Sequence, residues 1–389
     1  MEKIRLGILG VGNIGGDHVK RIVNGECPEI TLGAVCDLKP ERLAWAKETA
    51  GEALPTFADA REMIESGLID SLLVAVPHYD HPKYAMMAME AGLHVLIEKP
   101  AGVYTKQVLE MNECAKKHDV VFGIMMNQRT NCIYRKMREI VKSGELGAIK
   151  RTNWLITNWY RAQAYYDSGD WRATWSGEGG GVLLNQCPHN LDLWQWICGM
   201  PKKVHAHLHF GKWHDIEVED DVTAYFEYEN GATGVFITST ADAPGTNRFE
   251  VCGTLGKLVC EDDKLTYIKN EVDEREFCFT EKTGFARPKT EKIEVETDGK
   301  NPQHVGILRN FTNAILGKEE LFVKGEEGLM GVELMDACLL SGWLGKEVEL
   351  PIDDELYYQE LMKRVATSRQ KSNVREVVAD TSNTFGSAK

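Results

Sequence analysis

The stretch Gly10-Val11-Gly12-Asn13-Ile14-Gly15 decides the fold of the first half of the chain. It follows the apolar run Lys3 to Leu9, typical of a buried strand, and precedes a helical pattern that starts at Asp17. In a GxGxxG turn the first glycine allows a tight bend, the second lets the backbone approach a pyrophosphate, and the third permits close helix packing. The alternative is an ordinary strand-to-helix turn, but glycines, strand and helix in register favour a dinucleotide site.

An acidic residue stands where this motif requires one. Asp37 ends the second apolar run, 22 residues after Gly15, where a carboxylate accepts hydrogen bonds from the adenosine ribose hydroxyls. The same carboxylate would repel a 2'-phosphate, although Lys39 and Arg42 are close enough in sequence to receive one if their loop turns inward. We therefore expect NAD as the cofactor, with NADP the less favoured choice.

Working outward from the motif, short apolar runs alternate with amphipathic helical patterns, as in stacked βαβ units. Residues 1–127 are thus expected to form a Rossmann domain with a doubly wound parallel sheet. The expected strands are Lys3 to Leu9, Ile30 to Cys36, Leu72 to Val76, His94 to Ile97 and Val120 to Met125. The expected helices are Asp17 to Val23, Pro40 to Thr49, Ala58 to Glu65, His81 to Ala91 and Thr105 to Lys117.

The pattern changes after Asn131, and residues 128–367 are expected to form a second α/β domain with a large, open, mostly antiparallel sheet. A helix (Cys132 to Lys142) and a strand (Ile149 to Thr157) open this domain. The later expected strands are Val204 to Phe210, Val222 to Tyr228, Gly234 to Thr240 and Phe249 to Cys252, with a hairpin turn at Asn230-Gly231. Residues 280–302 have the composition of an exposed excursion, and residues 368–389 that of a loose tail or arm.

Composition excludes several classes of function. The chain has a net charge of -14 and no long block of charges of one sign, which argues against a nucleic-acid partner. No run approaches the ~20 apolar residues of a membrane span, and ten cysteines without a CxxC pair are typical of a reducing compartment, so a cytoplasmic protein is expected. His205, His207 and His209 alternate along one strand, but no carboxylate or cysteine completes a zinc set, so no metal site is expected.

Two further motifs carry a family resemblance. Glu98-Lys99-Pro100 follows the strand ending at Ile97, and Gly179-Gly180-Gly181 opens the segment Val182 to Asp192, which contains His189. Together with the N-terminal GxGxxG, the chain resembles the Gfo/Idh/MocA family. The resemblance implies a Rossmann domain and an α/β domain with NAD or NADP held between them, oxidation or reduction of a small-molecule sugar, inositol or related polyol, and assembly as a homodimer or homotetramer.

The resemblance also implies roles for particular residues. Lys99 and His189 would assist proton transfer: an imidazole with a pKa near ~6.5 suits the base, and the lysine can stabilise a developing alkoxide. The expected cofactor contacts are Gly10, Gly12, Asn13, Ile14, Gly15, Asp37, Pro77, His81, Glu98, Lys99, Asn127, Trp171 and Arg172.

The chain departs from the family pattern four residues before His189. Many members carry an Asp there as part of a catalytic trio, whereas this chain has Asn185, whose amide cannot take up a proton. On one continuous helix Asn185, His189 and Asp192 would share a face, unless the helix begins only at Pro188. Asp192 is expected either to orient His189 or to bond the backbone at a domain contact.

An aromatic-rich segment between Trp154 and Trp175 is suited to stacking against a pyranose ring, although about half of its rings are expected in the core or in a subunit interface. The expected substrate contacts are Asn185, Trp159, Tyr160, Tyr166, Arg172 and Asp192.

The leading hypothesis is an NAD-dependent dehydrogenase acting on a secondary hydroxyl of a sugar, an inositol or a glycoside, in the last case at C3. One alternative uses the same residues for glycoside cleavage, by transient oxidation at C3 and elimination of the aglycone, and would release aglycone without net NADH. The other is a non-catalytic NAD-binding sensor, which would bind NADH and turn over no polyol.

Overall fold

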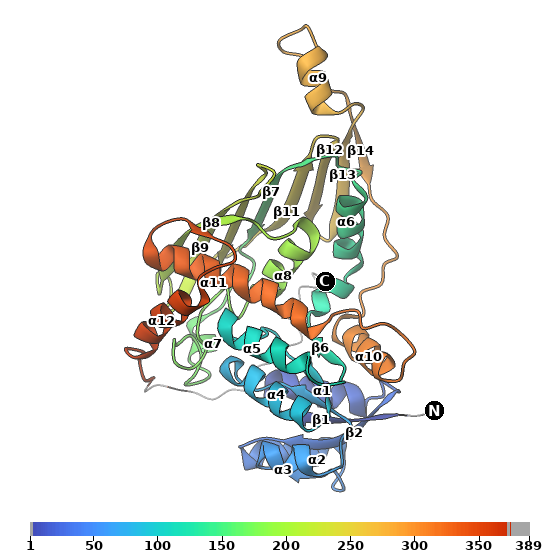
Figure 1. Ribbon diagram of the computed structural model, residues 1–389, viewed down its shortest axis with the longest axis vertical. Helices are drawn as coiled ribbons and strands as arrows, with labels where there is room; N and C mark the ends of the chain where they lie inside the picture. Colours follow the sequence, from blue (N-terminus) through green and yellow to red (C-terminus); the bar gives the residue numbers. More distant parts are fainter. Residues whose placement is uncertain (1–2, 372–373, 375–389) are drawn as a thin grey trace.

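Two sheets organise the computed structural model, which describes residues 3–371 and 374 (Figure 1). The N-terminal sheet is parallel throughout, with the strand order β3-β2-β1-β4-β5-β6. The predicted doubly wound sheet is therefore confirmed, and its order reverses between β1 and β4, where such folds bind ligands. The strands are β1 (Ile4–Leu9), β2 (Ile30–Cys36), β3 (Thr56–Phe57), β4 (Ser71–Val74), β5 (His94–Ile97) and β6 (Phe122–Ile124).

Amphipathic segments connect these strands at the predicted places. The helices are α1 (Asn13–Val23), α2 (Pro40–Ala50), α3 (Ala60–Glu65), α4 (His81–Glu90) and α5 (Thr105–Ala115), with the 3-10 turns η1 (His78–Asp80) and η2 (Asn127–Thr130). The edge strand β3 was not predicted, because two residues are too few for alternation to show.

The second sheet has the order β14-β13-β12-β11-β7-β10-β9-β8-β15 among the described residues. Only β7 and β10 pair in parallel, so the predicted mostly antiparallel sheet is confirmed. Asn230-Gly231 lies in the turn between β9 and β10, as predicted. The strands are β7 (Ile149–Ile156), β8 (Lys203–Phe210), β9 (Glu219–Glu227), β10 (Thr233–Ser239), β11 (Asn247–Gly253), β12 (Gly256–Glu261), β13 (Lys264–Asn270), β14 (Thr290–Glu294) and β15 (Val348–Glu349).

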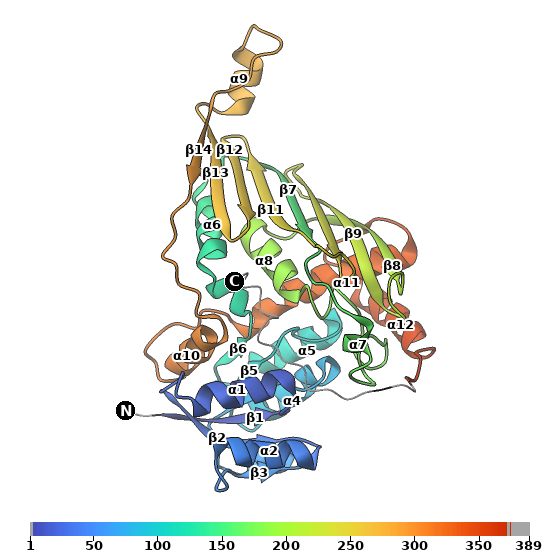
Figure 2. The ribbon, with the colours of Figure 1, turned by 180° about the vertical axis from the view of Figure 1, so that it is seen from behind.

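Helices cover one face of this sheet and join it to the N-terminal domain (Figures 1 and 2). Trp154 of β7 stacks on Phe249 of β11 with ring centroids 4.1 Å apart, and Trp194 packs against the same inner face. The expectation that some of the aromatic segment is core is thus confirmed for Trp154. The helices are α6 (Cys132–Ser143), α7 (Gln163–Tyr166), α8 (Pro188–Cys198), α9 (Glu274–Thr280), α10 (Gln303–Ile315), α11 (Gly328–Leu344) and α12 (Asp354–Val365), with the 3-10 turn η3 (Gly325–Glu327).

Helix α11 is apolar around its circumference and buried between the two domains. Its Asp336 accepts hydrogen bonds from the backbone N and the hydroxyl of Thr105, both at 2.7 Å, at the start of α5. The chain also returns to the first sheet near η3, where Gly123 of β6 bridges to Lys324. The C-terminal part of the chain therefore fixes the position of one domain against the other.

The predicted excursion is exposed, but it is partly ordered into secondary structure. Helix α9 precedes it and projects from the end of the second sheet (Figure 1), and strand β14 lies within it with all five residues exposed. Phe279 and Phe285 are 77% and 99% exposed there.

Candidate active site

The glycine-rich turn is shaped to receive a pyrophosphate. Gly10 has φ +88°, and a Cβ there would lie 2.6 Å from the Ala75 carbonyl oxygen, so only glycine fits. At Gly12 a Cβ would meet nothing within 4 Å, and no side chain caps the N-terminus of α1. Backbone N–H groups therefore face open space at the positive end of a helix, which is how such turns bind phosphate.

Asp37 and Arg42 hold this turn in place. The Asp37 carboxylate accepts hydrogen bonds from the backbone N of Val11 at 2.6 Å and of Lys39 at 2.9 Å. Arg42 donates to the Val11 carbonyl at 2.6 Å and stacks 4.7 Å from the centre of the Trp45 ring. Arg42 thus turns inward onto the glycine-rich turn, as the sequence analysis considered, and its guanidinium braces the backbone there.

Buried polar atoms at the nicotinamide end fit the same cofactor. Asn127 is fully buried, its Nδ2 donates to Gln303 at 2.5 Å, and its Oδ1 has no hydrogen-bond partner. The Nδ1 atoms of His78 and His189 are likewise buried without a partner. Burying a polar atom without a partner costs free energy unless a ligand or water bonds to it. The residues present therefore fit a dinucleotide. The turn and Asp37 would hold its adenosine side, and Asn127 would hold its nicotinamide side. When bound, this group supplies the hydride acceptor.

Glu98 and His81 support the site without facing it. Glu98 is 3% exposed and accepts a hydrogen bond from His18 of α1 at 2.7 Å. Burial raises the pKa of Glu98, but the contact with His18 together with the charges of Lys99 and His81 keeps that pKa below its ordinary value. The two ring nitrogens of His81 lie 2.7 Å from the Pro100 carbonyl and 2.8 Å from that of Val76. Both side chains, expected to contact the cofactor, are thus engaged with the protein, because the EKP turn needs anchoring to its neighbours.

Lys99 emerges from the end of β5 into the space between the domains. Its Nζ donates to the main-chain oxygen of Asn185 at 3.1 Å, and the Lys99–Pro100 peptide bond is cis. Burial lowers the pKa of Lys99, while the negative charges of Glu98 and Glu178 oppose that shift. A lysine with a lowered pKa exchanges a proton more readily near neutral pH than an exposed one.

His189 lies in the first turn of α8, which begins at Pro188. Proline is favoured at this position because its missing N–H has no helical partner there, so Asn185 precedes the helix and does not share a face with His189. Burial and the charge of Lys99 lower the pKa of His189 well below its ordinary value. The imidazole is therefore held in its neutral form, which can accept a proton but is a weaker base than an ordinary histidine.

Asn185 lies in a hydrogen-bond network that the sequence motif does not reveal. The Tyr165 hydroxyl contacts Asn185 Oδ1 at 3.3 Å, and Arg172 donates to that hydroxyl at 3.1 Å. On its other side, the Asn185 amide nitrogen donates to the buried carboxylate of Glu178. Arg172 also stacks 4.7 Å from the Tyr165 ring and 4.5 Å from the Trp171 ring, so these residues form one polar cluster beside Lys99.

Asp192 does not orient His189. Its two oxygens accept hydrogen bonds from Arg129 of η2 at 2.8 and 2.6 Å, and both side chains are 1% exposed. Arg129 also pairs with Glu327 at 2.5 Å. This buried ion pair joins α8 to η2 and η3, so both oxygens of Asp192 are already engaged by Arg129 and the side chain packs these elements together.

Within the aromatic segment, the structure separates two neighbouring tyrosines. Tyr166 is 3% exposed and its hydroxyl donates to Thr240 at 2.8 Å, whereas Tyr165 joins the Asn185 cluster. Tyr160 is 52% exposed, and Trp159 donates to Asn190 at 3.2 Å, beside His189. Tyr166, expected to touch substrate, is thus a packing residue, because the one-turn helix α7 directs it toward β10.

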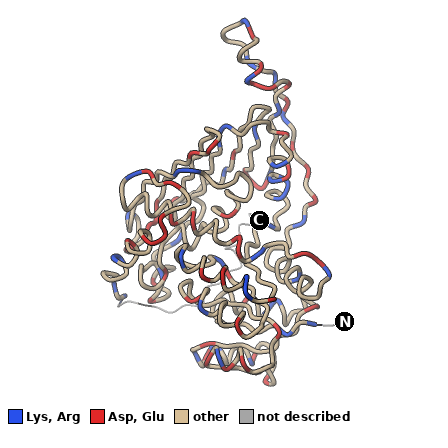
Figure 3. The backbone as a smooth tube through the Cα atoms, viewed as in Figure 1, with Lys and Arg blue, Asp and Glu red and all other residues tan. Residues whose placement is uncertain are grey.

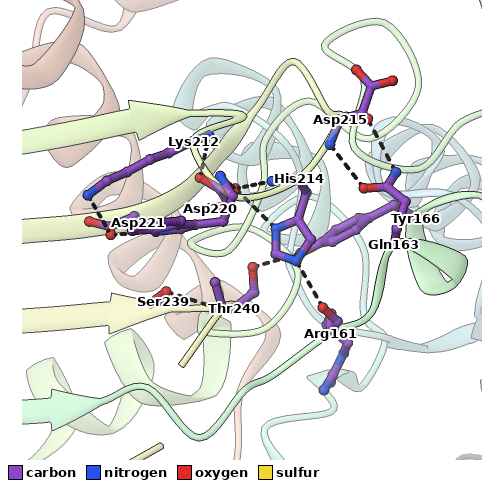
Figure 4. Close-up of polar contacts among 12 residues, drawn as sticks. Arg161, Gln163, Tyr166, Lys212, His214, Asp215, Asp220, Asp221, Ser239 and Thr240 are labelled. Carbon is purple, nitrogen blue, oxygen red and sulfur yellow. Dashed lines mark hydrogen bonds and ion pairs between the residues drawn. The ribbon is translucent and has the colours of Figure 1, made fainter. Parts of the chain in front are cut away.

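A loop between β8 and β9 fixes the aromatic segment from outside (Figure 4). His214 lies 3.1 Å from the Asp220 carboxylate and 2.9 Å from the Arg161 carbonyl, and its ring packs 4.9 Å from that of Tyr166. Asp220 is fully buried and accepts further bonds from the backbone N of Lys212 and Trp213. The segment that carries Trp159 and Tyr165 therefore has a rigid outer support.

The sequence analysis missed Glu178 and His78 as site residues. His78 is 7% exposed, its ring lies 5.8 Å from that of Trp171, and burial lowers its pKa well below the ordinary value. The one available signal was position, since Glu178 directly precedes the triple glycine and His78 directly follows Pro77.

The beginning of the predicted tail is attached near this cluster. Lys371 donates to the Tyr166 carbonyl at 2.7 Å, and the backbone N of Arg369 donates to Glu217 at 2.8 Å. Ser368 also bonds Ser176 and Glu217. Residues 368–371 are therefore an anchored segment, and the rest of the predicted tail, apart from residue 374, lies outside the described residues.

The part of the chain that the structure describes shows no second functional site in the form of a charged surface, a metal site or a membrane-spanning helix. Lysine and arginine are interspersed with acidic residues over both domains (Figure 3). The described residues contain no group of three His, Cys, Asp or Glu side chains placed to hold a metal ion. None of their helices is both long and apolar enough to span a bilayer.

The parallel sheet presents open backbone amides at its switch point, and a lysine and a neutral histidine lie at the domain boundary. These features together define an NAD-binding oxidoreductase. Residues 4–126 match the oxidoreductase family with an NAD-binding Rossmann fold, and residues 134–259 match the GFO/IDH/MocA C-terminal domain. The chain belongs to the Gfo/Idh/MocA family, as its motifs predicted.

Its relatives include named dehydrogenases. It is 26% identical to the D-glucoside 3-dehydrogenase of Escherichia coli K12 over 365 residues, which cover 89% of this chain and 97% of that protein. It is 26% identical to the myo-inositol 2-dehydrogenase of Thermotoga maritima over 273 residues, 68% of this chain and 77% of that one. The crystal structure of the WlbA dehydrogenase from Bordetella pertussis with NADH and UDP-GlcNAcA superposes with a TM-score of 0.75 at 26% identity, over 90% of this chain and 100% of that one.

Proposed function

We propose that this chain oxidises a secondary hydroxyl of a sugar glycoside at C3, with NAD as the hydride acceptor. The observation that carries the proposal is the position of Lys99 at the end of β5, bonded to Asn185 and close enough to His189 for its charge to lower the histidine pKa. A hydroxyl bound between these two groups meets a neutral base and a cation together. Loss of its proton then favours hydride departure from the same carbon.

The cluster beside Lys99 supports a pyranose as the substrate. Arg172, Tyr165 and Asn185 offer donors and acceptors. Trp171, which stacks with Arg172, and Trp159, beside His189, offer half-buried aromatic rings. Sugars are bound by this combination of stacking and hydrogen bonding. The choice of C3 is supported by the similarity to D-glucoside 3-dehydrogenase along nearly the whole chain.

The test is a panel of glucosides, free sugars and inositols with NAD and NADP in parallel, followed by NADH absorbance and by identification of the oxidised carbon. We expect NADH to form with a glucoside and the product to be its 3-keto derivative. Oxidation at another carbon would correct the position, and aglycone release without net NADH would replace the dehydrogenase by glycoside cleavage. Absence of turnover throughout the panel would contradict the proposal.

We also propose a homodimer or homotetramer that forms through the outer face of the second sheet. Leu155 and Tyr225 are 36% and 40% exposed on that face, which no helix of the described residues covers (Figure 2). Their cross-strand neighbours include Arg248 and Val235, and such a mixture of apolar and polar side chains is compatible with an interface between subunits. Light scattering coupled to gel filtration should give two or four times the mass of the 43.7 kDa chain, and a monomer would contradict this assignment.

A further inference from the structure

Glu178 is a buried carboxylate whose neighbours all present donors to it. Besides the Asn185 amide, the backbone N of Ala173 donates to it at 2.5 Å, and an Arg172 guanidinium nitrogen lies 4.0 Å away. Its side chain is 3% exposed. Burial raises the pKa of Glu178 above its ordinary value, and Arg172, Ala173 and Asn185 limit that rise. The donors at these contacts stabilise the carboxylate against its burial.

The direction of the hydrogen bonds in the cluster leads to the same result. Arg172 and Gln186 both donate to the Tyr165 hydroxyl oxygen, at 3.1 and 3.3 Å. The hydroxyl proton is therefore directed to Asn185 Oδ1, and the amide nitrogen of Asn185 must face Glu178. The chain of donors thus runs from Arg172 through Tyr165 and Asn185 and ends at the Glu178 carboxylate.

Asn185 is held from two sides by charged groups. Lys99 donates to its main-chain oxygen and Glu178 accepts from its side chain. Glu178 and Glu98 are the anions near Lys99, and Arg161 and Arg172 are the cations. The other titratable groups influenced by the charge of Lys99 are His78, His81, Cys187, His189 and His304. Glu178 is therefore the carboxylate that joins the substrate side of the site to Lys99.

We propose that Glu178 is a positioning residue for Asn185. It fixes the Asn185 amide with its nitrogen inward and its oxygen toward Tyr165, and with Glu98 it is one of the two carboxylates whose charge acts on Lys99. The turnover arm of the test rests on the proposed function, and the titration arm does not.

The first arm measures the titration of Lys99 without any substrate. Amines of the full chain are labelled with a trace of acetic anhydride from pH 6 to pH 11, and the peptide containing Lys99 is quantified by mass spectrometry. Glu178→Gln should move the midpoint of Lys99 labelling to lower pH, because an opposing charge is lost. Glu178→Gln combined with Asn185→Asp should return it toward the wild-type value, since the amide and the carboxylate have then exchanged places.

Two further variants make this titration specific. Glu178→Asp keeps the charge and should leave the Lys99 midpoint close to that of the wild type, which also provides a folded variant if Glu178→Gln is unstable. Glu219→Gln alters another buried carboxylate, which accepts bonds from Gly181 and Leu183 and does not touch Asn185. It should lower the melting temperature without moving the Lys99 midpoint.

The second arm measures turnover with whichever glucoside the panel identifies. Glu178→Gln should lower kcat about tenfold, less than the ~10²-fold loss of a group that transfers the proton itself, and the double variant should recover most of that loss. Asn185→Asp alone should be less active than the double variant, because two carboxylates would then share one contact. An unchanged Lys99 midpoint in Glu178→Gln, or a double variant no better than the single one, overturns the proposal. If no sugar is turned over, the proposed function fails, and the titration arm still decides the role of Glu178.

Discussion

The two domains contribute to the active site in different ways. The N-terminal domain offers mainly backbone groups: the uncapped amides that follow Gly12 at the start of α1, in a turn braced by Asp37 and Arg42. The C-terminal domain offers side chains from the segment 157–187, held by the loop that carries His214 and by contacts within the segment. A site built from backbone groups depends on a few residues that are close in sequence, so a motif can reveal it. A site built from side chains depends on the direction in which tertiary packing turns each side chain.

The buried ion pair that joins α8 to η2 should show the largest effect. Asp192→Ala leaves the Arg129 guanidinium buried with only Glu327 as its partner, so we expect the free energy of unfolding to fall by about 3–5 kcal/mol. Chemical denaturation measures it. A small loss of stability with a large rise in KM would instead return Asp192 to the substrate site.

The backbone site can be disturbed without disturbing the fold. A side chain at position 12 meets no protein atom within 4 Å, so Gly12→Asp should fold normally. Its carboxylate would face the pyrophosphate, and we expect NADH to bind at least about 100-fold more weakly, which is about 2.7 kcal/mol. Fluorescence titration with NADH checks this, and unchanged affinity would place the dinucleotide elsewhere.

The side-chain site is best tested by a matched pair of tyrosines. Tyr165→Phe removes a hydroxyl from the Asn185 cluster and should lower kcat/KM about tenfold, or about 1.4 kcal/mol. Tyr166→Phe removes the bond to Thr240 and should cost about 1 kcal/mol of stability with little change in kcat/KM. The reverse outcome would show that the sequence-based choice of Tyr166 was correct.

The smallest effects should appear in the pH dependence of stability. Burial lowers the pKa values of His78, His189 and His304 well below that of an unfolded histidine. In acid the unfolded chain therefore binds protons that the folded chain does not, and stability present above pH ~6.5 is lost as the pH falls. We expect the free energy of unfolding to fall by about 1 kcal/mol per histidine between pH 7 and pH 5.5. His78→Asn should reduce this slope, and thermal unfolding across the range measures it.

These contrasts explain how much the sequence could predict. Both sheets and the glycine-rich turn follow from periodicity and a short motif, which are local properties. The roles of Lys99 and His189 came from the family resemblance and stay predictions. The sequence could not predict that Tyr165 and not Tyr166 joins the Asn185 cluster, because the one-turn helix α7 decides which ring faces β10. The contact between Glu178 and Asn185 could not be predicted either, since it depends on the path of the backbone through the triple glycine.

We propose that Lys99 and His189, one from each domain, act on the same hydroxyl. The most direct measurement compares Lys99→Ala and His189→Ala with the wild type for both turnover of a glucoside and NADH affinity. We predict that kcat falls by about 10²-fold or more in each variant, while the dissociation constant of NADH changes by less than about threefold, or ~0.7 kcal/mol. Turnover at the wild-type rate in either variant would contradict the account.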